Sequence, residues 1–254
     1  MSMFLNGVTN SYVSRASAEA FGAFCSESDD TLLDQLRTRQ ALYVPPNGGF
    51  NNLLFEFYDH ENPLRVFSVY FKPAETSYPV ELLDTIEAHE LVKARNKLAL
   101  ERLEKQTLSF TEVIHHEAIW DLIRTDKNQK FIAYPNAVKA SDIVNHLNHL
   151  IYRVIAYPTY ELVLTNAWLP FYFGIYDTGT PGNPECATVF FQRSYNTSTV
   201  DYSCFAVMDS DLESGISLNV VDWVLSHPST VRETKDVVAA LEEVRDHLVN
   251  EGPI

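Results

Sequence analysis

The chain has 254 residues, a formal net charge of −15 and 46% hydrophobic residues. This hydrophobic share excludes an intrinsically disordered chain, and a chain of this length can bury a substantial core. An acidic surface repels phosphate backbones, which argues against direct binding to nucleic acid or to an anionic membrane. A basic surface on a protein partner is the expected complement, and solubility alone is the other explanation of the charge.

Cysteine usage and hydropathy bear on the compartment. Cys25, Cys186 and Cys204 are odd in number, far apart and without the spacing of a redox or zinc motif, which is typical of reduced thiols. The first residues lack the basic and apolar regions of a secretion signal, and no window is apolar for long enough to span a membrane. We therefore expect a cytoplasmic protein, in the host cytoplasm if the protein is viral.

The first part of the chain predicts a helix, a hairpin and a long helix. Acidic and hydroxyl residues at 28–31 precede LLDQLRTRQAL, the pattern of a helix start followed by a basic helix end. Residues 53–71, LLFEFYDHENPLRVFSVYF, predict two aromatic strands joined by a turn. Residues 79–106 predict the longest helix, whose apolar side chains lie on several sides rather than on one stripe.

A helix that is apolar on several sides must be covered on several sides. It is therefore broken, sandwiched within the protein or shared with a second chain. From this pattern we expect a homodimer, with an interface formed by Leu91, Val92, Leu98, Ala99 and Leu103.

The middle of the chain predicts two more helices. Residues 109–124 open with SFTE, which has the spacing of a capping box, and predict a helix. A short strand, KFIAY, is expected at 130–134. Residues 141–157 predict the most clearly amphipathic helix of the chain, and a bridging segment, TYELVLTNAW, follows it.

The last part predicts strands and a final helix. Residues 169–207 contain three aromatic-rich strands separated by turn residues. The apolar run at 217–225 is ambiguous in type. Residues 230–251 predict a helix whose apolar stripe consists of Val237, Leu241, Val244 and Leu248.

These elements predict an α+β fold, with antiparallel aromatic-rich hairpins packed by about five helices. The hairpin at 53–71 and the aromatic stretch at 169–207 share a Tyr-Asp pair, Tyr58-Asp59 and Tyr176-Asp177. The two therefore suggest interlocked lobes, 1–158 and 159–254, within one compact unit of residues 1–254.

Asp177-Thr178-Gly179 is the sequence feature closest to a catalytic motif. It follows an apolar strand and locally resembles the catalytic loop of aspartic proteases, which also follows an apolar strand. The protease chemistry requires two aspartates that share a proton, so a dimer would have to supply the second. The alternative is an ordinary turn, in which Asp and Gly are common.

Histidines supply two further candidates. His146 and His149 have a spacing that can place two imidazoles on one metal, although a solvated polar helix face also explains them. His116 is predicted on a helix one turn after Glu112, an arrangement that can tune a general base; a hydrogen-bonded core histidine is the alternative. The pattern completes no metal shell, and we expect no metal and no cofactor.

Five acidic residues are predicted to form a contact patch for a partner. Three of them alternate in one loop, and no basic residue lies within the loop. A solvated loop is the alternative explanation. The patch consists of Asp201, Asp209, Asp211, Glu213 and Asp222.

In its overall character the sequence resembles accessory proteins of large-genome (jumbo) bacteriophages. The resemblance is to acidic dimers that inhibit the host RNA degradosome, or to proteins associated with the phage nucleus. It depends on no motif, so it transfers no functional residue to this chain.

Two classes of function follow. The first is a non-enzymatic acidic module that binds, and inhibits, a basic nucleic-acid-binding surface of a partner protein; a structural or assembly role in a phage is a variant of it. The second is a hydrolase that uses Asp177 or His116. The first is the hypothesis that the sequence favours.

Overall fold

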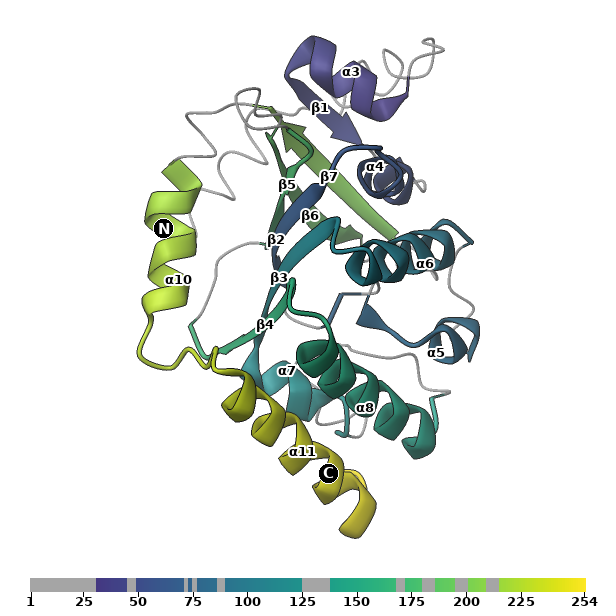
Figure 1. Cartoon of the computed structure of the whole chain (residues 1–254), viewed down its shortest axis with the longest axis vertical. Helices are drawn as coiled ribbons and strands as arrows, with labels where there is room; N and C mark the ends of the chain where they lie inside the picture. Colours follow the sequence, from purple (N-terminus) through teal and green to yellow (C-terminus); the bar gives the residue numbers. More distant parts are fainter. Residues whose placement is uncertain are drawn as a thin grey trace.

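The computed structural model describes residues 31–44, 49–70, 73–74, 77–85, 90–124, 138–167, 172–179, 186–194, 201–208 and 215–254. Within these ranges the chain forms one mixed seven-stranded sheet in the order β1-β7-β6-β5-β2-β3-β4. Helices pack on the sheet (Figure 1), and the predicted α+β class is confirmed.

The sheet has a parallel part and an antiparallel part. β2, β3 and β4 are parallel, whereas β5, β6, β7 and β1 continue the sheet in antiparallel pairs. The meander β5-β6-β7 confirms the three aromatic-rich strands predicted near the end of the chain. The strands are β1 (Ala41–Val44), β2 (Leu64–Tyr70), β3 (Leu108–His115), β4 (Tyr160–Thr165), β5 (Tyr172–Asp177), β6 (Cys186–Ser194) and β7 (Asp201–Val207).

Most helices cover one face of this sheet. The helices are α3 (Leu32–Arg39), α4 (Gly49–Tyr58), α5 (Val80–Thr85), α6 (Glu90–Glu104), α7 (His116–Asp121), α8 (Ala140–Ala156), the π-helix η2 (Ser217–Val221), α10 (Asp222–Ser226) and α11 (Thr234–Asn250). In Figure 1, α3, α4, α5, α6 and α8 lie on one side of the sheet and α10 lies on the other. None of the helices described is both long and apolar enough to cross a membrane.

Strand alternation separates two hydrophobic cores. Leu64 and Val66 of β2 belong to the larger core under the main helix layer, whereas Val69 belongs to a smaller core on the opposite face. Val224 of α10 is fully buried in this smaller core. The predicted stripe of the last helix is confirmed, since its four residues are buried in the larger core: Val237, Leu241, Val244 and Leu248.

The predicted hairpin at 53–71 is wrong in its first half, because Gly49–Tyr58 forms helix α4. Its buried side chains recur at helical spacing and include Phe57, which stacks on Tyr176 of β5 with ring centroids 4.8 Å apart. The aromatic content of the segment favours a strand, and packing against the sheet overrides that preference. The second half of the segment is β2, which pairs with β3 and β5.

The helix predicted at 109–124 is also wrong in its first half. Leu108–His115 is strand β3, and the helix is reduced to α7. A parallel partner on each side supplies backbone hydrogen bonds along the strand, so the capping-box pattern at its start is not used. The bridging segment that follows the amphipathic helix contains another buried parallel strand, β4. The strand predicted at 130–134 lies outside the described residues.

The long helix predicted at 79–106 consists of two helices, α5 and α6. The core of the same chain buries Val92, Ala99 and Leu103, and Leu98 packs against that core, while Leu91 is partly exposed. Four of the five residues predicted for a dimer interface are thus covered within one chain. The several-sided apolar pattern needs no second chain to explain it, and the homodimer itself stays a prediction.

The predicted lobes 1–158 and 159–254 contribute to one sheet. β2 from the first part lies between β3 of the same part and β5 of the second. β4 from the second part pairs with β3, and β1 pairs with β7. The sheet therefore interleaves strands from both parts, with β7, β6 and β5 of the second part between β1 and β2 of the first, and β4 at the far edge.

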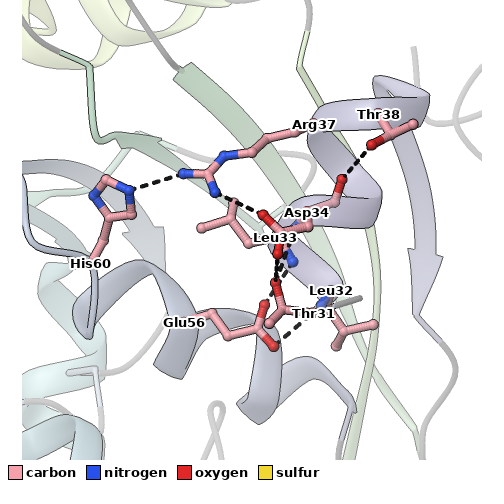
Figure 2. Close-up of polar contacts among 8 residues, drawn as sticks. All are labelled: Thr31, Leu32, Leu33, Asp34, Arg37, Thr38, Glu56 and His60. Carbon is pink, nitrogen blue, oxygen red and sulfur yellow. Dashed lines mark hydrogen bonds and ion pairs between the residues drawn. The ribbon is translucent and has the colours of Figure 1, made fainter. Parts of the chain in front are cut away.

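Glu56 of α4 holds the start of α3. Its carboxylate accepts hydrogen bonds from the backbone N–H groups of Leu32 and Leu33, at 3.2 and 2.6 Å (Figure 2). In the same view Arg37 points away from that end, toward His60, with 2.9 Å between Nη2 and Nε2. Burial raises the pKa of the Glu56 carboxyl. An acceptor from a neighbouring helix thus satisfies two of the free N–H groups at the helix start.

Replacing Glu56 with alanine is expected to lower the free energy of unfolding by about 1 kcal/mol, the usual cost of losing an N-terminal cap. The amide protons of Leu32 and Leu33 should then exchange faster with solvent, which hydrogen-exchange mass spectrometry can measure. The exposed Glu61, in the turn that follows α4, provides the control, and Glu61→Ala should leave exchange in α3 unchanged. Unchanged exchange in Glu56→Ala would show that α3 is held in some other way.

Candidate functional site

Asp177 lies in a structural turn. Its Oδ1 accepts the backbone N–H of Gly179 at 2.8 Å, and its Oδ2 is ion-paired with Arg65 of β2. The side-chain amide of Asn62 donates to the Thr178 carbonyl at 3.2 Å, which fixes the same turn from the β2 side. Both carboxylate oxygens of Asp177 are therefore used in holding β5 beside β2. The geometry favours the turn over the protease-like loop.

His115 and His116 lie at the junction of β3 and α7. The Nδ1 atom of His115 accepts the backbone N–H of Glu117 at 3.2 Å and so caps the helix. His116 is the first residue of α7 and is partly exposed. The expected helical arrangement of His116 above Glu112 is wrong, because Glu112 belongs to strand β3.

The structure does not complete a set of metal ligands around His146 and His149, the pair predicted to be able to bind a metal. His146 is fully buried and packs edge-to-face on Tyr78, with ring centroids 4.6 Å apart. His149 is partly exposed. Across the described ranges, no group of three or more His, Cys, Asp or Glu side chains could hold a metal ion.

The acidic patch is only partly within the described structure. Asp209, Asp211 and Glu213 lie outside the described residues. Asp222 is the exposed first residue of α10, and Asp201 is the first residue of β7. Because the three loop acids are outside it, the described structure does not assemble these five residues into a site.

A group of buried polar side chains surrounds Glu112, in the middle of β3. Glu112 is completely buried, and its carboxylate accepts three hydrogen bonds. The donors are the hydroxyls of Ser77 and Tyr160, each 2.6 Å from Oε2, and the backbone N–H of Ala74 at Oε1. Burial raises the pKa of Glu112, and these hydrogen bonds partly oppose that shift.

Arg153, in the last turn of α8, places a positive charge beside this carboxylate. Its side chain is fully buried, and the guanidinium lies over the Tyr160 ring, 5.6 Å from the centroid. Its Nε, Nη1 and Nη2 atoms have no hydrogen-bond partner among the described residues. Burial lowers the pKa of Arg153, and the nearby Tyr160 and Glu112 oppose that shift.

His149 lies one helical turn before Arg153 on the same side of α8. Its Nε2 atom is buried and has no hydrogen-bond partner among the described residues, although the residue as a whole is partly exposed. Burial lowers the pKa of His149 to about 4, and the charge of Arg153 adds to the shift. The imidazole is therefore neutral at pH 7. At this residue the polar cluster reaches the protein surface.

Tyr160 connects the two charged groups. Its hydroxyl donates to Glu112 while its ring faces Arg153. Burial raises the pKa of Tyr160 well above its ordinary value, and the negative charge of Glu112 adds to that effect. Tyr160 thus stays protonated as a hydrogen-bond donor.

We refer to Glu112, Arg153, His149 and Tyr160 as the α8 polar cluster. The Glu112 carboxylate already accepts three hydrogen bonds, whereas the three guanidinium nitrogens of Arg153 and the Nε2 atom of His149 have no hydrogen-bond partner among the described residues. A guanidinium is a planar set of N–H donors that fits the oxygens of a carboxylate or phosphate. The cluster therefore has the chemistry to hold an anionic group beside α8.

Sequence reasoning missed most of this cluster. The sequence pattern places Arg153 and His149 on the polar side of a helix and Tyr160 in a bridging segment. One signal was available in β3, where LSFTEVIH alternates and puts Glu112 in line with Leu108, Phe110 and Ile114 on the core face. A glutamate at an inward position of an apolar strand requires partners in the interior.

Comparison with known proteins gives no family: no family model and no curated protein matches the chain. Among solved structures, the chain is similar to the phosphatidylserine synthase of Haemophilus influenzae Rd KW20, with 11% sequence identity and a TM-score of 0.43. The match covers 84% of this chain and 44% of the synthase, so the chain spans less than half the length of that protein. A likeness at this level transfers neither activity nor functional residues.

The same comparison corrects one prediction. The sequence favoured a non-enzymatic acidic module that inhibits a basic protein partner, whereas the synthase, one of the solved structures similar to this chain, is an enzyme. The predicted non-enzymatic module disagrees with that similarity and is not proposed again. Whether this chain catalyses a reaction is a separate question, and its expected lack of activity stays a prediction.

Proposed function

We propose that the chain binds a small molecule through an anionic group, a carboxylate or a phosphate, at the α8 polar cluster. The observation that carries the proposal is Arg153, a fully buried cation whose three nitrogens have no hydrogen-bond partner among the described residues. Burying an ionised group without hydrogen bonds is costly, by several kcal/mol. An anion on the guanidinium offsets that cost.

The alternative is a purely structural pair of Arg153 and Glu112. Glu112 attracts Arg153 electrostatically, but the hydrogen bonds described for this carboxylate come from Ala74, Ser77 and Tyr160. The charge of Arg153 is thus partly balanced while its donors are left over. A ligand oxygen supplies the hydrogen-bond acceptor that Arg153 does not find in the pair with Glu112.

Binding is tested by isothermal titration calorimetry with inorganic phosphate, sulfate, acetate and citrate. We expect saturable binding of at least one anion, and about 2.7 kcal/mol of added stability at a concentration of 100 Kd. Arg153→Met should weaken that binding at least about tenfold, because a charge-assisted hydrogen bond contributes roughly 1.5–3 kcal/mol.

Arg245 offers a matched control, since it is a partly buried arginine of α11 that hydrogen-bonds to Asn148 of α8. Arg245→Met should bind the anion as the original chain does. His149→Gln provides a second test if Arg153→Met does not fold. Equal anion affinity in the original chain and in a folded Arg153→Met protein would disprove the proposal.

A further inference from the structure

The donors of the α8 polar cluster come from two side chains. The guanidinium of Arg153 is planar, and a carboxylate, which is also planar, can fill its fork alone. The Nε2 atom of His149 belongs to a separate ring one helical turn away, and it too lacks a partner among the described residues. A tetrahedral phosphate has oxygens outside one plane, so it can accept from the fork and from the imidazole together.

The balance of charge in the cluster also bears on a phosphate ligand, and it predicts that His149 gains a proton. Arg153 already has the negative charge of Glu112 nearby, so a phosphate group brings more negative charge than the site can balance. A proton on His149 would balance it. Building on the proposed anion site, we infer that the ligand is a phosphate monoester of a small soluble molecule, and that His149 takes up a proton when the ester binds.

The surroundings of His149 allow this change. Its low pKa has two causes, burial and the positive charge of Arg153. An anion between the two side chains reverses the second cause, so the pKa of His149 rises when the site is filled. The free site therefore contains a neutral imidazole, and the filled site an imidazolium.

The other titratable groups in this region have fixed roles. Glu112 of β3 and Tyr160 of β4 are hydrogen-bonded to each other, and His146 of α8 packs on Tyr78. From α11, Arg245 donates to Asn148, the neighbour of His149, and is ion-paired with two acids of its own helix, Glu242 and Asp246. On the side of α5, Asp84 is ion-paired with Lys93. These contacts leave His149 as the group that responds to the ligand.

Calorimetry with glycerol 3-phosphate in buffers of different ionisation enthalpy measures the number of protons taken up. The ligand titrates too, so the informative quantity is the difference between the original chain and His149→Gln with the same ligand. We expect the original chain to take up close to one proton more at pH 6. Relative to His149→Gln, the original chain should gain up to about tenfold in affinity for glycerol 3-phosphate for each pH unit below the pKa that His149 has in the ligand-bound protein.

The outcomes separate this inference from the proposed function. Binding of acetate as tight as that of glycerol 3-phosphate, or equal proton uptake by the two chains, would overturn the inference and leave the anion site standing. Absence of binding by every anion would remove both. Binding to vesicles containing phosphatidic acid, without a response to glycerol 3-phosphate, would also overturn the choice of a soluble ester. Circular dichroism confirms that His149→Gln is folded.

Discussion

Glu112→Gln is expected to lower the free energy of unfolding by about 3 kcal/mol. Two hydroxyl donors converge on Oε2 of Glu112 and a backbone N–H meets Oε1. Glutamine has one oxygen in place of two, so its NH₂ group must face at least one of these donors. A buried donor left without an acceptor costs roughly 1–3 kcal/mol, and Arg153 loses its nearby negative charge as well. Chemical denaturation followed by circular dichroism measures the change.

Glu161 on the neighbouring strand β4 is the matched control. It is a partly exposed glutamate that is ion-paired with Arg232. Glu161→Gln should cost less than about 1 kcal/mol, because exposed ion pairs contribute little. A double variant, Glu112→Gln with Arg153→Met, should lose less stability than the sum of the two single variants, since each single variant leaves the charge of the other side chain unbalanced. Strict additivity would show that the two side chains do not interact.

Arg102→Met should have an effect of similar size, about 3 kcal/mol, for a different reason. Arg102 of α6 is almost fully buried, and its guanidinium donates to the carbonyls of Tyr58 at 2.8 Å, His60 at 2.5 Å and Asn62. These carbonyls belong to the last residue of α4 and to the turn after it, and the Arg102 guanidinium joins that turn to α6. Methionine fills a similar volume but leaves all three acceptors without that donor.

The exposed Lys97 of the same helix tests whether loss of charge alone matters, and Lys97→Met should change stability by less than about 0.5 kcal/mol. The loss of stability in Arg102→Lys should lie between those of Lys97→Met and Arg102→Met, because an ammonium group has its donors on one nitrogen and cannot bridge several carbonyls as a guanidinium does. An Arg102→Met protein as stable as Lys97→Met would mean that the turn after α4 is held without this side chain.

The sequence predicts an element well where one face of it is buried. The last helix shows its four-residue stripe directly, and the aromatic strands near the end of the chain pair as expected. The prediction for the segment that forms helix α4 is wrong because its sequence pattern is compatible with both a helix and a strand. Phe50, Leu53, Leu54 and Phe57 recur at helical spacing, whereas their aromatic and apolar character suits a strand.

The α8 polar cluster was hidden for another reason. Periodicity separates an apolar stripe from a polar face, and it assigns the polar face to solvent. The fold covers more of α8 than its apolar stripe, so Arg153 is buried on β4 although helical periodicity places it on the polar side of the helix. Burial of a charged side chain depends on partners distant in sequence, here Glu112 and Tyr160, and a local pattern does not contain them.

The order of strands in the sheet has a consequence for synthesis on the ribosome. Of the strands that the structure describes, β1 is the first to be made, and its only neighbour in the sheet is β7, the last of them. At about 5–20 residues per second, the stretch between them takes on the order of 10–30 s to translate. During that time the nascent chain must keep β1 from pairing with other strands. Residues 41–44 therefore stay without their partner strand until β7 has left the ribosome.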